Sequence, residues 1–144
     1  MKRLLLAVLA LFGMSAAHAD PVELRTGQVW TFENAPAEET RIIIGDIEPF
    51  DDDVAVSVSI LGVPFQKIAD GRFVGGAMYH LPFSETALKP ALLELVSENE
   101  PLPAGYSDGY EMWKEAVERG EAGIFIITPA DILESVGGII SGKD

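Results

Sequence analysis

The sequence contains no cysteine and only two histidines among its 144 residues. Without cysteine the chain can form no disulfide, no thiolate metal site and no cysteine nucleophile. The same absence excludes anchoring through a lipid-modified cysteine. One histidine, His18, lies in an N-terminal export segment, so His80 is the histidine left for any chemistry of a folded domain.

Basic residues are also scarce, with ten Lys and Arg against 23 Asp and Glu, for a formal net charge of −13. A surface of this sign repels phosphate backbones and anionic headgroups, because binding to either depends on Lys and Arg. We therefore expect neither nucleic acid nor a membrane surface as a partner. A protein partner is expected to be cationic, although acidity indicates solubility before it indicates recognition.

The N-terminal segment combines a basic start, an apolar run and small residues. Lys2 and Arg3 precede the apolar residues 4–12, and Ala17-His18-Ala19 has small residues at both positions that a signal peptidase recognises. The apolar run is well short of the roughly 20 residues of a membrane-spanning helix. The sequence therefore predicts a signal peptide cleaved after Ala19, and a location in the periplasm or outside the cell.

The predicted signal peptide covers residues 1–19 and leaves residues 20–144 as a single domain. Its removal takes away two of the ten basic residues and none of the acidic ones, so the net charge falls from −13 to −15. A domain of this size can bury a sufficient core without disulfides or a metal.

The first half of the domain alternates between apolar and polar residues, which predicts strands. The alternation is clearest in residues 54–61, where valines and an isoleucine share one face and Ser57 and Ser59 the other. The simplest arrangement is an antiparallel meander with one face against a core. The acidic run 48–53 is predicted to be an exposed connection and residues 62–71 a loop. The predicted strands are 27–33, 40–47, 54–61 and 73–81.

Further along the chain the apolar residues recur at helical spacing. A helix is predicted to begin with Ser84 as its N-cap and to continue to Val96. Pro90 removes a backbone donor inside this segment, so either the helix kinks there or a second, shorter helix begins. Another helix is predicted at Asp108, which with Glu111 resembles a capping box.

The C-terminal part adds one strand and one helix. Residues 122–127 are continuously apolar, which predicts a strand covered on both faces. Thr128 as a cap and Pro129 at the first position predict a last helix that ends at Gly137-Gly138. The sequence as a whole predicts an α+β domain, with an antiparallel β-meander of four to five strands and two to three helices in the C-terminal half.

No established catalytic motif surrounds His80. A serine triad would need a nucleophile such as Ser84, but Gly-x-Ser-x-Gly is absent and Ser84 is already predicted as a helix cap. The favoured interpretation is a histidine satisfied by a local hydrogen bond. A phosphate-binding loop and a dinucleotide fingerprint are also absent, so we expect no catalytic residue, no cofactor and no metal site.

Two other interpretations of the acidic residues stay open. The run Asp51-Asp52-Asp53 could hold calcium through oxygen ligands, although it lacks the glycine and the spacing of an EF-hand loop. The same run also fits a solvated hairpin turn. A pair of carboxylates beside aromatic residues such as Tyr110 and Trp113 could hydrolyse a glycoside, although aromatic residues at regular spacing usually supply buried area.

Six short motifs follow one another along the domain. They are Gly27-x-x-Trp30-x-Phe32, Glu38-Glu39, Ile47-Glu48, His80-x-Pro82-Phe83-Ser84, Gly109-Tyr110-x-x-Trp113 and Ala122-Gly123-Ile124-Phe125. With these motifs the chain resembles a group of small bacterial proteins over nearly all of the domain. No activity is attached to that group, so the resemblance implies a shared fold and no reaction.

These features together predict an exported protein that acts by binding and has no catalytic residues. The expected contact surface joins the strand-to-helix junction at His80, Pro82 and Phe83 to the acidic turn of Asp51, Asp52 and Asp53. The alternatives are a small carboxylate-based hydrolase of envelope carbohydrate, assisted by His80, and a calcium-binding envelope module.

Overall fold

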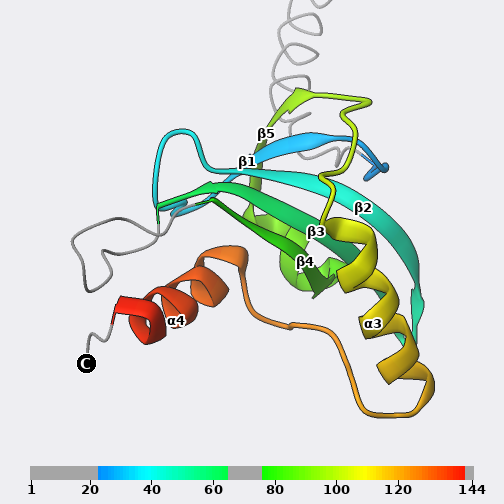
Figure 1. Cartoon of the computed structure of the whole chain (residues 1–144). Helices are drawn as coiled ribbons and strands as arrows, with labels where there is room; N and C mark the ends of the chain where they lie inside the picture. Colours follow the sequence, from blue (N-terminus) through cyan, green and yellow to red (C-terminus); the bar gives the residue numbers. More distant parts are fainter. Residues whose placement is uncertain (1–22, 65–75, 142–144) are drawn as a thin grey trace, which may run out of the picture.

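A five-stranded antiparallel sheet with helices on both faces forms the protein (Figure 1). The computed structural model describes residues 23–64 and 76–141. The strands are β1 (Val29–Phe32), β2 (Arg41–Phe50), β3 (Asp53–Val63), β4 (Gly76–Ser84) and β5 (Leu92–Ser97). The helical segments are α2 (Glu85–Leu88), the 3₁₀ turn η2 (Lys89–Ala91), α3 (Tyr106–Glu118) and α4 (Pro129–Ser141). The predicted α+β class is confirmed. No helix in the described ranges is long and apolar enough to cross a membrane.

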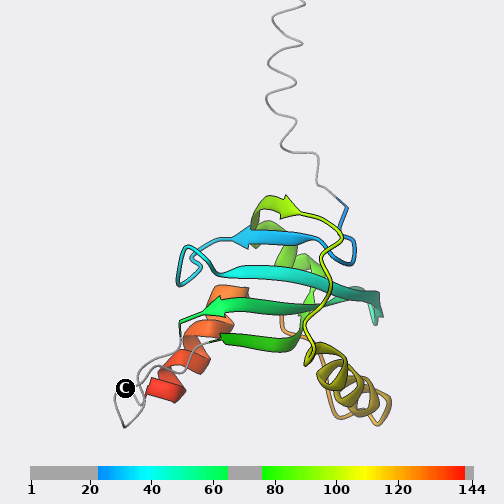
Figure 2. The ribbon, with the colours of Figure 1, turned by 45° about the horizontal axis from the view of Figure 1, so that its top comes forward.

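The strand order is β4-β3-β2-β1-β5, so the chain builds a meander from β1 to β4 and then crosses to the opposite edge (Figure 2). The segments α2 and η2 make this crossing over one face of the sheet, where Leu88 is fully buried. Every neighbouring pair of strands is antiparallel, which confirms the predicted meander. The fifth strand comes from a segment that the sequence predicts as helix.

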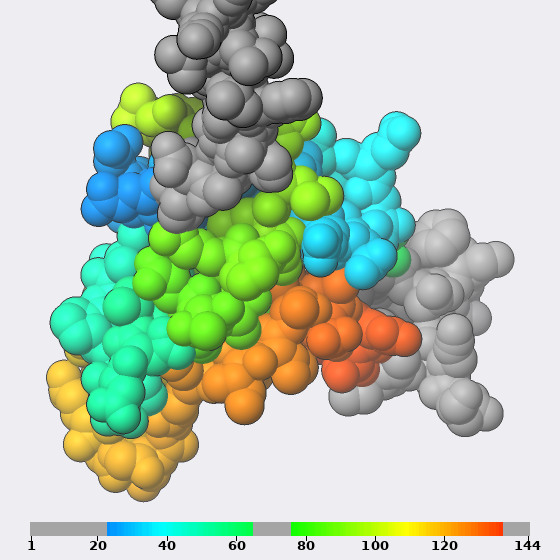
Figure 3. All heavy atoms as spheres, turned by 180° about the vertical axis from the view of Figure 1, so that it is seen from behind, coloured from blue at the N-terminus to red at the C-terminus, as the bar shows by residue number. Residues whose placement is uncertain are grey.

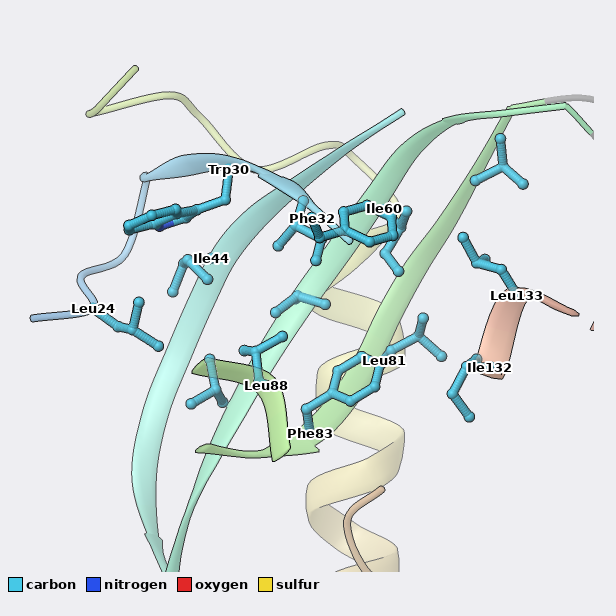
Figure 4. Packing of buried hydrophobic residues seen from close by; sticks show 14 residues of the cluster. Leu24, Trp30, Phe32, Ile44, Ile60, Leu81, Phe83, Leu88, Ile132 and Leu133 are labelled. Atoms are coloured by element: carbon cyan, nitrogen blue, oxygen red, sulfur yellow. The ribbon is translucent and has the colours of Figure 1, made fainter. Parts of the chain in front are cut away.

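The hydrophobic core lies between this first face of the sheet and the crossing segment (Figure 4). Val56, Val58 and Ile60 of β3 are fully buried there, as their alternation predicts. The start of α4 adds Ile132 and Leu133 to the same cluster. Figure 3 shows the crossing segment in light green next to the start of α4 in orange, so the two together cover this face.

The predicted helix from Ser84 to Val96 is wrong beyond its first turn. Ser84 does cap α2, since its hydroxyl accepts a hydrogen bond of 3.3 Å from the Ala87 amide. Pro90 then lies in η2, and the chain continues as β5, which pairs with β1. Strand β1 would otherwise have an unpaired edge, so pairing in the sheet outweighs the helical spacing of the side chains.

Three predictions about loops and helix ends need correction. The predicted capping box is wrong, because α3 begins at Tyr106 and Asp108 lies inside its first turn. Helix α4 continues through Gly137-Gly138 to Ser141. The acidic run 48–53 is not one exposed connection, because β2 extends to Phe50.

The apolar residues 122–127 do not form a covered strand. Phe125 makes a single bridge to Phe83 of β4, and Ile126 is 77% exposed. The predicted loop 62–71 begins inside β3, which extends to Val63, and the rest of it falls mostly within residues 65–75, outside the described residues. The first residues of the predicted strand 73–81 lie there as well.

Candidate functional site

Two β-bulges lie side by side, one on each neighbour of β3. In β2, Gly45 and Asp46 together oppose Ser57, and in β4, Tyr79 and His80 together oppose Ser59. A bulge bends its strand and changes the direction of its side chains. These two bulges direct side chains to the second face of the sheet, opposite the core, and α3 lies on that face.

Helix α3 approaches the sheet closely because glycines stand at the points of contact. A Cβ added to Gly109 of α3 would lie 2.8 Å from the Cβ of His80. On β2, a Cβ added to Gly45 would lie 2.5 Å from Cζ of Tyr106. Both distances are too short for real Cβ contacts, so a larger residue at Gly109 requires the helix to move, and one at Gly45 requires the Tyr106 ring to leave its position.

The centre of this contact is the His80 cluster, which consists of His80, Ser57, Tyr106, Tyr110 and Trp113. The Nε2 atom of His80 lies 2.9 Å from Oγ of Ser57. The ring centroids of the three aromatic residues lie 5.5, 5.8 and 5.5 Å from that of the imidazole. Ser57 is fully buried and His80 is half-buried, so the aromatic side chains of α3 cover the imidazole.

Two carboxylates of β2 border the His80 cluster. The hydroxyl of Tyr106 accepts a hydrogen bond of 2.8 Å from the Asp46 amide and donates one of 2.9 Å to the Asp46 carboxylate. The hydroxyl of Tyr110 donates a hydrogen bond of 2.8 Å to Glu48, whose other oxygen pairs with Lys114. These contacts connect α3 to β2 through polar groups.

The environment shifts the pKa values of three rings in the cluster. Burial lowers the pKa of His80, and the negative charges of Asp46 and Glu48 oppose this shift in part. Burial also raises the pKa of Tyr106 and of Tyr110, and the carboxylates that accept their hydrogen bonds raise it further. At neutral pH the cluster is therefore best described with a neutral imidazole and two protonated phenols.

The His80 cluster is not a serine triad. Ser57 is fully buried in the sheet, and among the described residues no carboxylate hydrogen bonds to His80. The Ser84 hydroxyl caps α2 and donates its hydrogen bond to the Asp53 carboxylate. The structure gives His80 the local hydrogen bond that the sequence predicts for a lone histidine.

The junction residues Pro82 and Phe83 do not form a surface with His80. Both are buried, and Phe83 is 0% exposed within the core cluster. Phe83 therefore packs inside the protein and has no exposed area with which to anchor a partner, because its side chain points to the first face and that of His80 to the second.

The three aspartates of the acidic turn, Asp51 to Asp53, differ in their exposure and hydrogen bonding. Asp51 and Asp52 are exposed at the turn, and Asp51 has a φ of 52°, a conformation that aspartate tolerates better than most residues. The Asp53 carboxylate accepts hydrogen bonds of 2.5 Å from the Ser84 hydroxyl and 2.7 Å from the Val54 amide, and these bonds lower its pKa. In the described ranges no three Asp, Glu or His side chains are grouped closely enough to hold a metal ion.

Segments distant in the sequence meet around α3. The indole N–H of Trp113 donates a hydrogen bond of 2.8 Å to the carbonyl of Gly123. Phe125 exchanges two backbone hydrogen bonds of 2.8 Å with β4, from its amide to the Pro82 carbonyl and from the Ser84 amide to its own carbonyl. The segments 80–84, 109–113 and 122–125 are therefore near one another in the fold.

Sequence reasoning did not identify Ser57 or Lys114 as members or neighbours of a site, and it considered Asp46 only as a neighbour of a possible calcium site at Asp51-Asp52-Asp53. No sequence pattern marks Ser57 and Ser59 as buried, because they alternate with apolar residues as solvent-facing residues would, yet both are 0% exposed. Buried hydroxyls need partners, so they indicate a second packed face of the sheet.

The chain matches no family model, and neither the curated proteins nor the solved structures with which it was compared contain a match.

Proposed function

We propose that this protein acts by binding a cationic protein partner and catalyses no reaction itself. The observation that carries the proposal is the environment of His80, whose Nε2 is hydrogen bonded to a buried serine and whose ring is covered by aromatic side chains. A general base must reach a substrate proton, directly or through one water. The side chain best suited to catalysis instead supports the packing of α3 on the sheet.

The charge distribution supports a cationic partner. The chain has a net charge of −13, and the outer face of α3 exposes Asp108, Glu111, Glu115 and Glu118. Like charges three and four residues apart destabilise a helix slightly, so this face is not optimised for helix stability. A surface of one sign attracts an oppositely charged partner over long distances and accelerates association.

The predicted leader supports binding outside the cytoplasm. Residues 1–19 have the composition of a signal peptide, and a chain without cysteine has no thiol that an oxidising compartment could convert to a disulfide. We propose the periplasm as the location of the protein after cleavage behind Ala19.

The test is capture from periplasmic extract on the immobilised exported protein over a series of salt concentrations. A cationic partner should bind at low salt and elute as salt rises, because screening weakens charge attraction. An unrelated protein of equal size and charge is the control for simple ion exchange. The variant His80→Gln, if folded, should capture the same partner, and failure to recover any specific partner would contradict the proposal.

A carboxylate-based hydrolase is the second candidate, and one arrangement favours it. Asp46 and Glu48 lie two residues apart on β2, beside His80 and the aromatic residues Tyr110 and Trp113. A hydrolase of this kind should release reducing ends from peptidoglycan or a polysaccharide, and Glu48→Gln should abolish that release. No release by the unmodified protein would exclude this candidate.

A further inference from the structure

The two edges of the sheet are treated differently. At the β4 edge, Phe125 continues the ladder through two backbone hydrogen bonds of 2.8 Å. At the other edge, β5 is the last strand, and no further strand within the described residues pairs with it (Figures 1 and 2). The outer side of an edge strand presents N–H and C=O groups that an extended segment of another protein can pair with.

The side chains of β5 leave apolar area exposed beside this edge, which a further strand could contact. Leu93 is 59% exposed and Val96 is 48% exposed, whereas Leu92 and Leu95 pack against the core cluster. Proteins commonly protect a free edge with lysine, proline or a β-bulge. Strand β5 contains no lysine or proline, although it is bulged opposite Thr31 of β1. Its one charged residue is Glu94.

The charge around β5 selects the kind of partner. Residues 92–100 include Glu94, Glu98 and Glu100 and no lysine or arginine. A second copy of the chain has the same net charge of −13 and is repelled, whereas a basic segment places its cations opposite these glutamates. An extended basic segment is therefore the occupant that the charges favour.

We propose that β5 binds an extended, basic segment of a partner protein as a sixth strand of the sheet. The proposal rests on the proposed function, because it specifies where the cationic partner is held. The backbone of β5 supplies the hydrogen bonds that give affinity. Leu93 and Val96 contact apolar side chains of the segment, and Glu94 and Glu98 pair with its lysines or arginines.

The probe is a short synthetic peptide of the repeat Lys-Lys-Val-Val, which presents both residue types on each face of a strand, added to the isotope-labelled exported protein. We expect chemical-shift changes and slower amide exchange in β5 in the nuclear magnetic resonance spectra. A second peptide of the same sequence, with N-methyl groups on alternate amides, keeps every charge and side chain but cannot form the ladder. It should bind at least about tenfold more weakly, because it loses several backbone hydrogen bonds.

A matched pair of double variants distinguishes binding at the β5 edge from nonspecific attraction by the net charge of the protein. The double variant L93K/V96K replaces the two exposed apolar residues of β5, and I126K/I127K replaces two others that are 77% and 42% exposed elsewhere. Both change the net charge equally. L93K/V96K should weaken peptide binding about tenfold relative to I126K/I127K, since two cross-strand contacts are lost and two like charges are introduced.

Several results would overturn the proposal. They are equal binding of the N-methylated peptide, shift changes confined to α3, equal binding by the two double variants, or self-association that L93K/V96K abolishes. Capture from periplasmic extract separates this failure from failure of the proposed function. A specific partner held equally by both double variants would refute the β5 site alone, whereas no partner for the unmodified protein would refute the proposed function.

Discussion

Gly109→Ala tests the description of α3 on the sheet, because two opposite effects act at that position. In the interior of an exposed helix, replacing glycine by alanine stabilises by about 1 kcal/mol. Here the new Cβ would lie 2.8 Å from the Cβ of His80, well inside an ordinary contact. The Cβ of His80 is fixed to the backbone of β4 and cannot rotate away, so α3 has to move off the sheet.

The contact with His80 outweighs the gain in helix propensity. Inserting a methyl group into a well-packed contact costs about 1–3 kcal/mol. Lifting α3 also weakens the ring contacts of His80 with Tyr106, Tyr110 and Trp113, each of which contributes about 0.5–1.5 kcal/mol. Against the helical gain, we expect a net loss of about 1–3 kcal/mol in the free energy of unfolding. The melting temperature should fall by roughly 5 °C or more.

Urea denaturation followed by tryptophan fluorescence measures this loss, with two controls. Gly123→Ala adds a Cβ that meets nothing within 4 Å, so its effect should stay within about 0.5 kcal/mol. In a His80→Gly background the opposing Cβ is gone, and Gly109→Ala should there stabilise by about 1 kcal/mol. A stabilising effect of Gly109→Ala in the unmodified protein would refute the contact between α3 and His80.

Three other predictions address the cluster and the leader. Ser57→Ala removes the partner of His80 Nε2 and should cost about 1–3 kcal/mol in urea denaturation, and an unchanged midpoint would contradict the hydrogen bond. Because burial lowers the pKa of His80 below 6.5 in the folded protein, the unfolded chain takes up the proton first. The free energy of unfolding should therefore fall as pH drops below about 6.5, and His80→Gln should flatten that part of the curve in thermal scans. Mass spectrometry of the protein from the periplasm should give a chain beginning at Asp20, and an intact Met1 on the folded protein would refute the leader.

The β-bulges explain why part of the fold could not be predicted. A spacing of three residues between apolar side chains indicates a helix, yet one inserted residue gives a strand the same spacing on one face. In β5, Leu92 and Leu95 both pack on the core, with Leu93 and Glu94 together opposite Thr31. Strands β2 and β4 repeat this spacing in the pairs Ile44 with Ile47 and Met78 with Leu81.

Strand β3 has no bulge between Val54 and Ile60, and the alternation of that part predicted its position correctly. The use of its other face was not predictable, because Ser57 and Ser59 are buried by contacts with β4 and α3, which follow much later in the chain. The same limit applies to His80, for which a local hydrogen bond could be predicted but not the residue that makes it. The geometry of the His80 cluster depends on the positions of the bulges in β2 and β4, and no local sequence pattern predicted those positions.

The position of α3 outside the hydrophobic core has a consequence for the internal motions of the protein. No residue of α3 belongs to the core cluster, and the helix is held by the His80 cluster and by the hydrogen bonds of Tyr106 and Tyr110. It can therefore detach in a sub-global opening that leaves the cluster on the first face intact. Backbone amides of α3 would then exchange with solvent at a lower opening free energy than those of β3. Acid should lower the opening free energy of α3 in particular, because protonation of His80 is favoured when the imidazole is released from the cluster.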